Sequence, residues 1–175
     1  METGLPLTVI YPGWVYGPGD RAFFPSLAEA IAGGQLVFWC RDVVLAWVYI
    51  DNLVDACVLA STAPQAIGEG YLIHDGAAGP TLEELGARLA AVLGAKTPTV
   101  HVPYPVAYGV ASVLQRVWRV LRLRGAPPLT TADVKAFGRP FRLSNEKALD
   151  HLGWKPRVSV EEGMARAIAE LGPRG

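Results

Sequence analysis

Short apolar runs alternate along the chain with segments of helical periodicity, and glycines or prolines separate them. Runs with the length and β-branched content of buried strands occupy residues 7–11, 36–39, 43–50, 71–74 and 99–102. Apolar positions at helical spacing predict helices over residues 25–31, 53–61, 82–93, 106–123, 131–137, 144–152 and 159–171. The alternation predicts an α/β fold.

Local signals support several helix boundaries. Thr81 and Glu84 have the spacing of a capping box, in which each side chain bonds to the other residue's backbone. Gly94 follows the same predicted helix, at a position where glycine commonly ends one. Asp51 and Asn52 are expected to cap the helix that starts at residue 53.

Composition narrows the class of protein. Hydrophobic residues make up 51% of the 175 residues and charged residues 18%, which argues against intrinsic disorder and predicts a single unit over residues 1–175. The 16 basic and 16 acidic side chains balance, so nucleic acid is not an expected partner. No cationic and apolar leader opens the chain, and prolines interrupt its longest uncharged run, residues 97–115. A cytoplasmic protein is therefore expected.

The metal-binding and thiol residues predict no special chemistry. Cys40 and Cys57 lie among apolar residues and are expected to be buried free thiols in a reducing compartment. His74, His101 and His151 lack the spacing of a metal site, so no metal is expected.

A basic stretch leaves two interpretations open. Arg116, Arg119 and Arg122 recur every third residue on a predicted helix, and Arg124 follows them. Such a helix can bind an anionic or membrane surface. The favoured interpretation is a solvated face above a core stripe, so a membrane partner is not expected.

The loop after the first predicted strand is the main candidate for chemistry. Residues 12–20 are rich in glycine and proline and follow a strand end, where open α/β sheets bind their ligands. From composition alone, a plain tight connection is the favoured interpretation. No GxGxxG or GxxxxGK[ST] phosphate-binding motif occurs in the chain.

Four ordered segments resemble the extended short-chain dehydrogenase/reductases, which include NAD-dependent epimerase/dehydratases, dihydroflavonol reductases and 3-beta-hydroxysteroid dehydrogenases. Residues 11–20 (YPGWVYGPGD) resemble that family's RPxxVYGPGD segment, and residues 47–56 (WVYIDNLVDA) resemble its HVDDLAxA element. Residues 142–156 are similar to its SxxKAxxxLGWxP sequence, and residues 159–163 (SVEEG) to the start of its last helix.

The resemblance is to the carboxyl-terminal part of that family. It implies the last strands of a Rossmann-type parallel sheet, a small and mainly helical substrate-binding lobe, and NAD or NADP as cofactor. The family's glycine-rich turn and its catalytic YxxxK pair are not in this chain. The chain alone is therefore expected to have no catalytic residues of its own, to be inactive and to bind NAD(P) weakly. It is expected to associate with a missing amino-terminal half or with further copies of itself.

The resemblance also implies roles for individual residues. Pro12 and Gly13 match the backbone segment near the nicotinamide. Trp14 matches a position where sugar-nucleotide enzymes often carry a substrate-binding Asn, and Tyr16 and Trp47 are its expected neighbours around a small-molecule substrate. The alternative is that Trp14 only packs in the core of the lobe.

The substrate is expected to be small and uncharged. Val44 and Leu45 stand where the family often places an Arg that clamps a phosphate, and Arg139 and Arg142 are the candidate substitutes. An Arg in a surface loop is more often simply solvated, and this alternative stays open. The implied activity is that of an oxidoreductase or epimerase/dehydratase that works by hydride transfer. A non-catalytic binding or structural module that has lost the cofactor half is the alternative.

Overall fold

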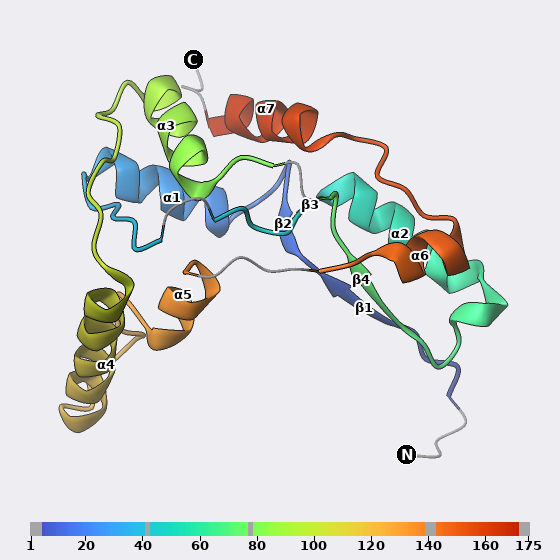
Figure 1. Cartoon of the computed structure of the whole chain (residues 1–175), viewed down its shortest axis with the longest axis horizontal. Helices are drawn as coiled ribbons and strands as arrows, with labels where there is room; N and C mark the ends of the chain where they lie inside the picture. The colour runs from blue at the N-terminus through green and yellow to red at the C-terminus, as the bar shows by residue number, and fades with distance from the viewer. Residues whose placement is uncertain (1–4, 41–42, 77–78, 139–142, 172–175) are drawn as a thin grey trace. The chain divides into compact units, whose positions relative to one another are not determined.

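A computed structural model describes residues 5–40, 43–76, 79–138 and 143–171. In chain order its elements are β1 (Val9–Pro12), β2 (Trp14–Tyr16), α1 (Phe23–Ala32), β3 (Trp47–Tyr49), α2 (Ile50–Thr62), the 3-10 turn η1 (Pro64–Ala66), β4 (Gly70–Ile73), α3 (Leu82–Leu93), α4 (Tyr104–Val120), α5 (Thr131–Ala136), α6 (Glu146–Leu152) and α7 (Val160–Leu171) (Figure 1). In the described ranges, no helix is both long and apolar enough to cross a membrane.

The chain divides into two compact units, and the division falls within α1. The first unit comprises residues 1–26, 45–79 and 141–175, and the second comprises residues 27–44 and 80–140. The predicted α/β class is confirmed, because parallel strands and helices alternate in the structure.

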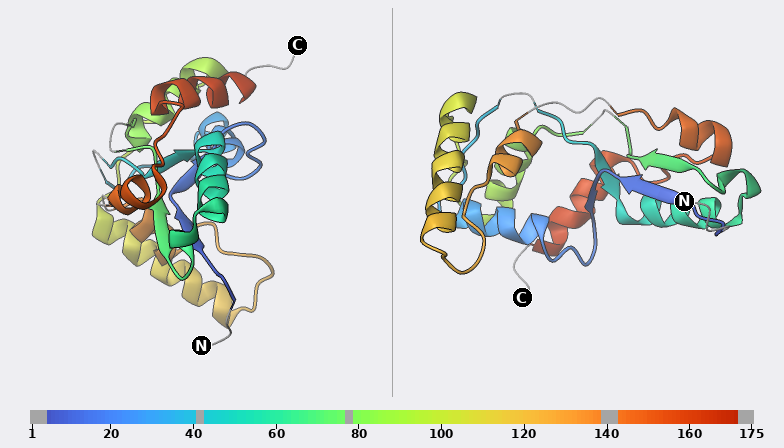
Figure 2. Two further views of the ribbon diagram at one scale, coloured as in Figure 1. Left: turned by 90° about the vertical axis from the view of Figure 1, so that its right-hand side faces the viewer. Right: turned by 90° about the horizontal axis from the view of Figure 1, so that it is seen from below.

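The first unit contains two pairs of parallel strands. β1 pairs with β4 from Val9 opposite Gly70 to Pro12 opposite Ile73, and the two strands run side by side in both views of Figure 2. β2 pairs with β3, with Trp14 opposite Trp47. Since β1 and β2 are separated by one residue, a nearly continuous segment contributes to both pairs.

Helices α2 and α6 supply the core of the first unit. Both pack on strands, and they contact each other. The buried cluster consists of Val48, Ala56, Ala60, Ala66, Tyr71, Ile73, Ala148, Leu152 and Trp154. Trp154 is 1% exposed, and its indole Nε1 donates a hydrogen bond of 2.9 Å to the Asn52 carbonyl. β1, by contrast, is largely exposed along its length.

The second unit is mainly helical and has a smaller core. α4 and α5 contact each other, and they bury Ala107, Ala111 and Val134 against the partly buried Trp39, Val102, Tyr104 and Leu129. The helix α3 begins with the predicted capping box of Thr81 and Glu84 and ends at Gly94, which is in the left-handed conformation. This helix has the predicted bounds.

Three predicted strands are shorter than expected. Residues 36–39 and 99–102 form only an isolated parallel bridge, Phe38 with His101. Residues 43–50 contain the short β3 and one bridge, Val44 with Thr81. The apolar side chains of these runs are buried by packing, as Phe38 is (2% exposed), and such burial requires no continuous ladder.

The prediction for the cysteines was wrong for Cys57, which is exposed, and Cys40 is only half-buried. Cys57 lies on a face of α2 that also exposes Val54 and Val58. Apolar neighbours in the sequence did not imply burial here, because α2 turns those neighbours outward as well.

Candidate functional site

Gly13 marks the point where the chain changes hydrogen-bonding partners. Its own N–H donates to the Ile73 carbonyl at 2.9 Å, on the β4 side, whereas the N–H of Trp14 donates to the Ala46 carbonyl at 2.6 Å, on the β3 side. A Cβ at Gly13 would lie 2.0 Å from the Ala46 oxygen, so only glycine fits. The carboxyl ends of β1 and β4 therefore lie directly beside the start of the β2–β3 pair, at the sheet edge where α/β proteins bind ligands.

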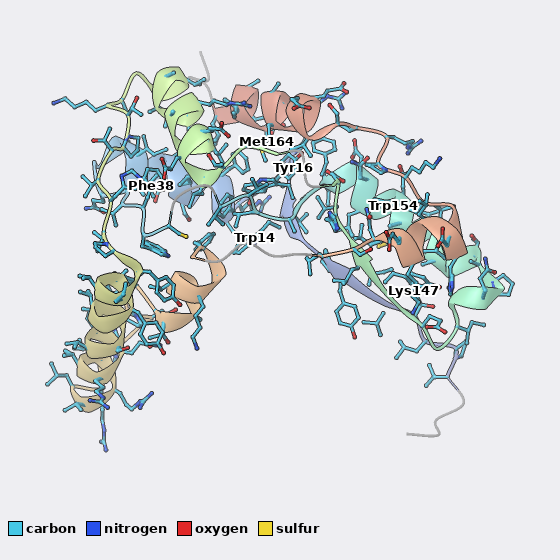
Figure 3. The ribbon with its side chains drawn as sticks, viewed as in Figure 1. Trp14, Tyr16, Phe38, Lys147, Trp154 and Met164 are labelled. Carbon is cyan, nitrogen blue, oxygen red and sulfur yellow. The ribbon has the colours of Figure 1, made fainter. Side chains whose placement is uncertain are left out.

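The three aromatic residues predicted to surround a substrate differ in exposure. Tyr16 and Trp47 are each 1% exposed, and their rings meet edge to face with centroids 5.7 Å apart. Trp14, labelled in Figure 3 beside Tyr16, is half-buried. Its ring packs against that of Phe23, with centroids 5.5 Å apart. Among the three, Trp14 offers a ligand the most surface, while Tyr16 and Trp47 form the packed layer to which it belongs.

The Tyr16 hydroxyl is enclosed by the start of α7. It donates a hydrogen bond of 3.4 Å to the Val160 carbonyl, and a Cβ at Gly163 would lie 2.6 Å from its oxygen. Burial raises the pKa of Tyr16 far above its ordinary value, and the charge of Asp75 adds to this effect. Tyr16 therefore stays protonated at neutral pH and does not serve as a general base.

Asn52, which the sequence predicts only as a structural residue at the start of a helix, is the centre of a buried hydrogen-bond network. Its buried side chain donates to the Asp75 carboxylate at 2.9 Å and to the Val158 carbonyl at 2.8 Å. Its Oδ1 accepts from the N–H groups of Arg157, at 2.9 Å, and Val158, at 3.0 Å. All four hydrogen-bonding positions of the amide are thus used, which ties α2 to two other segments.

This network explains why the predicted helix cap was wrong. α2 begins at Ile50, with Tyr49 at the N-cap and no side-chain cap bond, so Asp51 and Asn52 lie inside the helix. Asn52 turns its amide into the protein because buried partners are available there. The only sequence signal was its position in the segment that resembles HVDDLAxA.

Asp75 follows β4 and is the buried carboxylate of this edge. It accepts hydrogen bonds from the Tyr49 N–H at 2.7 Å and from the Asn52 amide. Burial raises the pKa of Asp75, although these two hydrogen bonds act in the opposite direction. The carboxylate therefore holds the end of β3 in position beside the end of β4.

His74 is also held by the backbone around it. Its Nδ1 accepts from the Gly76 N–H and its Nε2 donates to the Leu143 carbonyl, both at 3.1 Å, an assignment that follows from the bonding partners. The Asn145 amide donates to the His74 carbonyl at 2.8 Å. Both ring nitrogens are engaged, so His74 is a structural residue here.

A hollow of about 280 Å³ lies at the carboxyl ends of β2 and β3. Its lining consists of Val15, Tyr16, Gly17, Pro18, Gly19, Asp20, Arg21 and Ile50. The Asp20 carboxylate in this loop accepts from the N–H groups of Ala22 at 2.8 Å, Phe23 at 3.1 Å and Phe24 at 2.9 Å. Asp20 therefore caps α1, and three of its acceptor positions are used by the backbone.

The helix starts of the first unit are poorly suited to the pyrophosphate of a dinucleotide. Asp20 already occupies the start of α1, and acidic residues lie in the first turns of the other helices, namely Asp51 in α2, Glu146 in α6, and Glu161 and Glu162 in α7. Negative charge there repels a phosphate from the site that a free helix start offers. The nicotinamide end of a dinucleotide requires an accessible stretch of backbone. Pro12 is exposed, and Gly13, the next residue, is half-buried. Among these residues, Pro12 and Gly13 at the strand end are accessible and carry no acidic side chain, so a nicotinamide contact there remains a prediction.

Arg139 and Arg142, the predicted substitutes for a phosphate-clamping Arg, lie outside the described residues. Within the described ranges, no group of three or more His, Cys, Asp or Glu side chains is placed to hold a metal ion.

Sequence comparison identifies relatives across almost the whole chain. Residues 4–103 match the model of the 3-beta hydroxysteroid dehydrogenase/isomerase family. A 2-alkyl-3-oxoalkanoate reductase of Stenotrophomonas maltophilia is 34% identical over 173 residues, which cover 96% of this chain and 52% of the reductase. A 3beta-hydroxysteroid-dehydrogenase/decarboxylase of Arabidopsis thaliana is 29% identical, over 95% of this chain and 32% of that protein. The chain therefore spans about half the length, or less, of these curated relatives.

Solved structures show the same fold. The UDP-glucose 4-epimerase of Thermotoga maritima, solved with UDP-glucose, superposes with a TM-score of 0.62 at 26% identity, over 97% of this chain and 47% of the epimerase. The UDP-glucuronic acid 4-epimerase of Bacillus cereus, solved with UDP-glucuronic acid and NAD, superposes with a TM-score of 0.60 at 16% identity, over 97% of this chain and 47% of that epimerase. The second likeness bears on the fold alone.

Proposed function

Because the chain belongs to the 3-beta hydroxysteroid dehydrogenase/isomerase family, we propose that it forms the substrate-binding part of an NAD(P)-dependent oxidoreductase. Membership in this family confirms the resemblance to the extended short-chain dehydrogenase/reductases. It also favours an oxidoreductase over a non-catalytic module.

The observation that carries the proposal is the arrangement at Gly13. The change of strand partners there holds Trp14 at a sheet edge, half-buried and with part of its ring accessible. An aromatic ring in that place stacks on a flat, apolar substrate and excludes water from it. Phe23 packs against the Trp14 ring and also against the ring of buried Trp47, so the Trp14 ring is linked to the packed interior.

The substrate class follows from the relatives and from the lining. The reductase of Stenotrophomonas maltophilia is named for a 3-oxo group on an alkyl-substituted alkanoate, and the dehydrogenase of Arabidopsis thaliana is named for a 3-hydroxy group on a steroid. We assign this chain to the same chemistry, the interconversion of a ketone and a secondary alcohol. Val44 and Leu45, in place of a phosphate-clamping Arg, favour an uncharged substrate over a sugar nucleotide.

The roles of the chain's own residues are to bind and to orient. When bound, the nicotinamide supplies or accepts the hydride, and Pro12 and Gly13 are the residues that would lie against it. Trp14 holds the substrate against that segment. Tyr16 keeps its proton at neutral pH. In this proposal the proton that the reaction needs comes from the catalytic pair expected in the other half of the protein.

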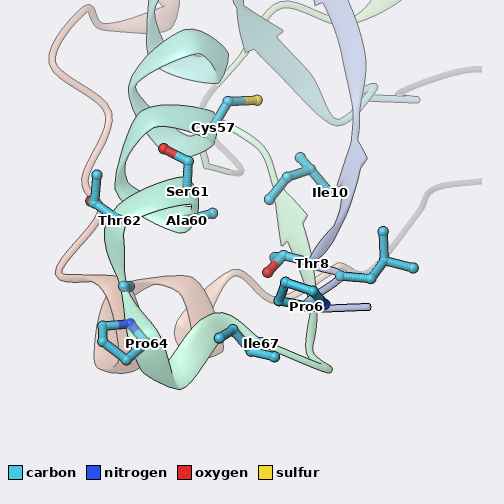
Figure 4. A pocket seen from close by; sticks show the side chains of 11 residues that line it. Pro6, Thr8, Ile10, Cys57, Ala60, Ser61, Thr62, Pro64 and Ile67 are labelled. Atoms are coloured by element: carbon cyan, nitrogen blue, oxygen red, sulfur yellow. The ribbon is translucent and has the colours of Figure 1, made fainter. Parts of the chain in front are cut away.

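A further segment is needed to complete the sheet in this proposal. Tyr11 in β1 is 54% exposed, and Leu7, just before the strand, is 60% exposed. A hollow of about 710 Å³ opens between the start of the chain and the second half of α2, where Ile10, Cys57, Ala60 and Ile67 line it (Figure 4). Parallel strands are normally covered and paired on both sides. We assign the hollow and the exposed strand to contact with a cofactor-binding half that carries the missing glycine-rich turn.

An assay of the complete gene product tests the proposed function. We expect oxidation of NADH or NADPH when an apolar ketone is added, and no epimerisation of UDP-glucose. Absence of ketone-dependent oxidation with either nucleotide, while UDP-glucose is epimerised, would assign the protein to sugar-nucleotide chemistry and overturn the proposal.

A further inference from the structure

The short strand β3 is held along both of its edges. In the pairing with β2, Trp14 lies opposite Trp47, and the Trp14 N–H donates to the Ala46 carbonyl at 2.6 Å. Successive residues of a strand direct their backbone groups to opposite edges, so Trp47 and Tyr49 use the edge away from β2. There the Trp47 carbonyl accepts from the Asp75 N–H at 2.8 Å, and the Tyr49 N–H donates to the Asp75 carboxylate at 2.7 Å. Asp75 therefore bonds to β3 twice.

The side chain of Asp75 completes a strand pairing that its backbone begins. In a parallel pair, a residue donates its N–H to one partner and accepts, through its carbonyl, from the N–H two residues further along. Asp75 donates to Trp47 in this way, but its carboxylate replaces the carbonyl as the acceptor for Tyr49. β4 itself ends at Ile73, and Gly76 has a φ of +112°, so the chain turns beside Asp75. The carboxylate thus extends the pairing past the end of β4.

A second contact fixes the orientation of this carboxylate. Its other oxygen accepts from the Asn52 amide at 2.9 Å. Asn52 is fully buried and is itself fixed by hydrogen bonds with Arg157 and Val158. Both carboxylate oxygens therefore have partners, and Asp75 cannot release Tyr49 by rotation without also losing the bond from Asn52.

We infer that Asp75 is a positioning residue for the substrate and acts through β3 and Trp14, an inference that rests on the proposed function. The segment that leads into β3 supplies the backbone anchor of Trp14 at Ala46. The ring of Phe23 contacts those of Trp14 and Trp47, with centroids 5.5 and 5.6 Å apart. A displacement of β3 therefore changes the position of the Trp14 ring, and substrate affinity depends on that position.

Fluorine NMR of the chain labelled with fluorotryptophan tests the positioning without any substrate. Trp14→Phe removes one resonance and so identifies that of Trp14. This resonance should shift or broaden in Asp75→Ala, and it should change less in Asp75→Asn, which keeps an acceptor for the Tyr49 N–H. If Asp75→Ala does not fold, Asp75→Asn carries the test. Asp133→Ala is the matched control, because it removes a carboxylate that accepts the Thr130 N–H at 2.8 Å in α5, and it should leave the Trp14 resonance unchanged.

Steady-state kinetics of the complete gene product test the effect on the substrate. Asp75→Ala should raise the KM for the apolar ketone roughly fivefold and leave the KM for NADH or NADPH unchanged. Because Asp75 acts through Trp14, the double variant with Trp14→Ala should have the ketone KM of Trp14→Ala alone. A residue that only stabilises the fold produces no such dependence on Trp14.

An unchanged Trp14 resonance in both Asp75 variants would overturn the inference. Effects on the ketone KM that multiply in the double variant, or an equal rise in Asp133→Ala, would also overturn it. If the complete gene product shows no ketone-dependent oxidation of NADH or NADPH, the proposed function fails. The Trp14 resonance then decides separately whether Asp75 positions the ring.

Discussion

The backbone of Gly13 lies against the carbonyl of Ala46, at a distance that leaves no room for a side chain. The next residue donates its N–H to that same carbonyl at 2.6 Å. One close contact thus joins the end of β1 to the segment that leads into β3. The position of Trp14, and with it the proposed substrate site, depends on this contact.

Replacement of Gly13 by Ala should disrupt the site and the first unit together. The added Cβ would lie 2.0 Å from the Ala46 oxygen, which is backbone and cannot turn aside. We expect the free energy of unfolding in urea to fall by about 3 kcal/mol. Gly109→Ala is the matched control, because nothing lies within 4 Å of that position in α4, and it should raise stability by about 0.5–1 kcal/mol. Equal stability of the two variants would contradict the account.

Asn52→Asp should destabilise the protein even though the family often carries Asp at this position. The carboxylate cannot donate to Asp75 or to the Val158 carbonyl, and it adds a second negative charge beside Asp75. The expected loss in urea unfolding is about 3 kcal/mol or more. Gln65→Glu makes the same chemical change at an exposed amide and should cost less than about 1 kcal/mol. A tolerated Asn52→Asp would show that the network contributes little.

Local signals made the helices more predictable than the strands. The bounds of α3 follow from Thr81, Glu84 and Gly94, which act within a single helix. The strands predicted at residues 36–39 and 99–102 depended on partners distant in the sequence, and Phe38 and His101 form one bridge only. β2 was missed because its three residues lie in a loop rich in glycine and proline.

The candidate site was predictable only in part, because its contacts also join residues that are distant in the sequence. The sequence places Gly13 and Trp14 after a strand, but nothing in it shows that Ala46 is the neighbour of Gly13. The hydrogen bonds of Asn52 reach residues 75, 157 and 158, and no local pattern encodes such contacts. The roles of Pro12, Gly13, Trp14, Tyr16 and Trp47 toward cofactor and substrate stay predictions.

The stability conferred by Asp75 should depend on pH. Because burial raises its pKa in the folded protein, the folded state holds the proton more tightly than the unfolded chain does. This contribution is fully present below the ordinary carboxyl pKa of about 4 and is lost as the pH rises through the raised value. The stability of the wild type relative to Asp75→Asn should therefore be greater in acid than at neutral pH. Urea unfolding of both proteins between acid and neutral pH checks this prediction. A difference in free energy of unfolding, wild type minus Asp75→Asn, that grows toward neutral pH would contradict it.

Truncation of the two tryptophans should have unequal effects on stability. Trp47 is 1% exposed, so Trp47→Ala should cost about 3–5 kcal/mol. Trp14 is half-buried, and Trp14→Ala should cost less than about 2 kcal/mol. Trp14→Phe retains an aromatic ring and serves as the control. Equal losses in urea unfolding would identify Trp14 as a core residue.

The nicotinamide nucleotide should bind weakly to this chain alone. The helix starts of the first unit carry acidic residues, and the sequence contains no glycine-rich turn for a pyrophosphate. Calorimetric titration with NADH and with NADPH should detect no dissociation constant at or below the low micromolar range, about 10 μM. A tighter complex with either nucleotide would show that the cofactor site lies within these residues.

The most direct test of a substrate-binding role is steady-state kinetics of the complete gene product with Trp14→Ala. The account predicts that the KM for the apolar ketone rises roughly tenfold, because the stacking surface is lost, while the KM for NADH or NADPH stays the same. Trp14→Phe should restore most of the affinity for the ketone. An unchanged KM for the ketone in a folded Trp14→Ala variant, or a change confined to the nucleotide, would contradict the assignment of this site to the substrate.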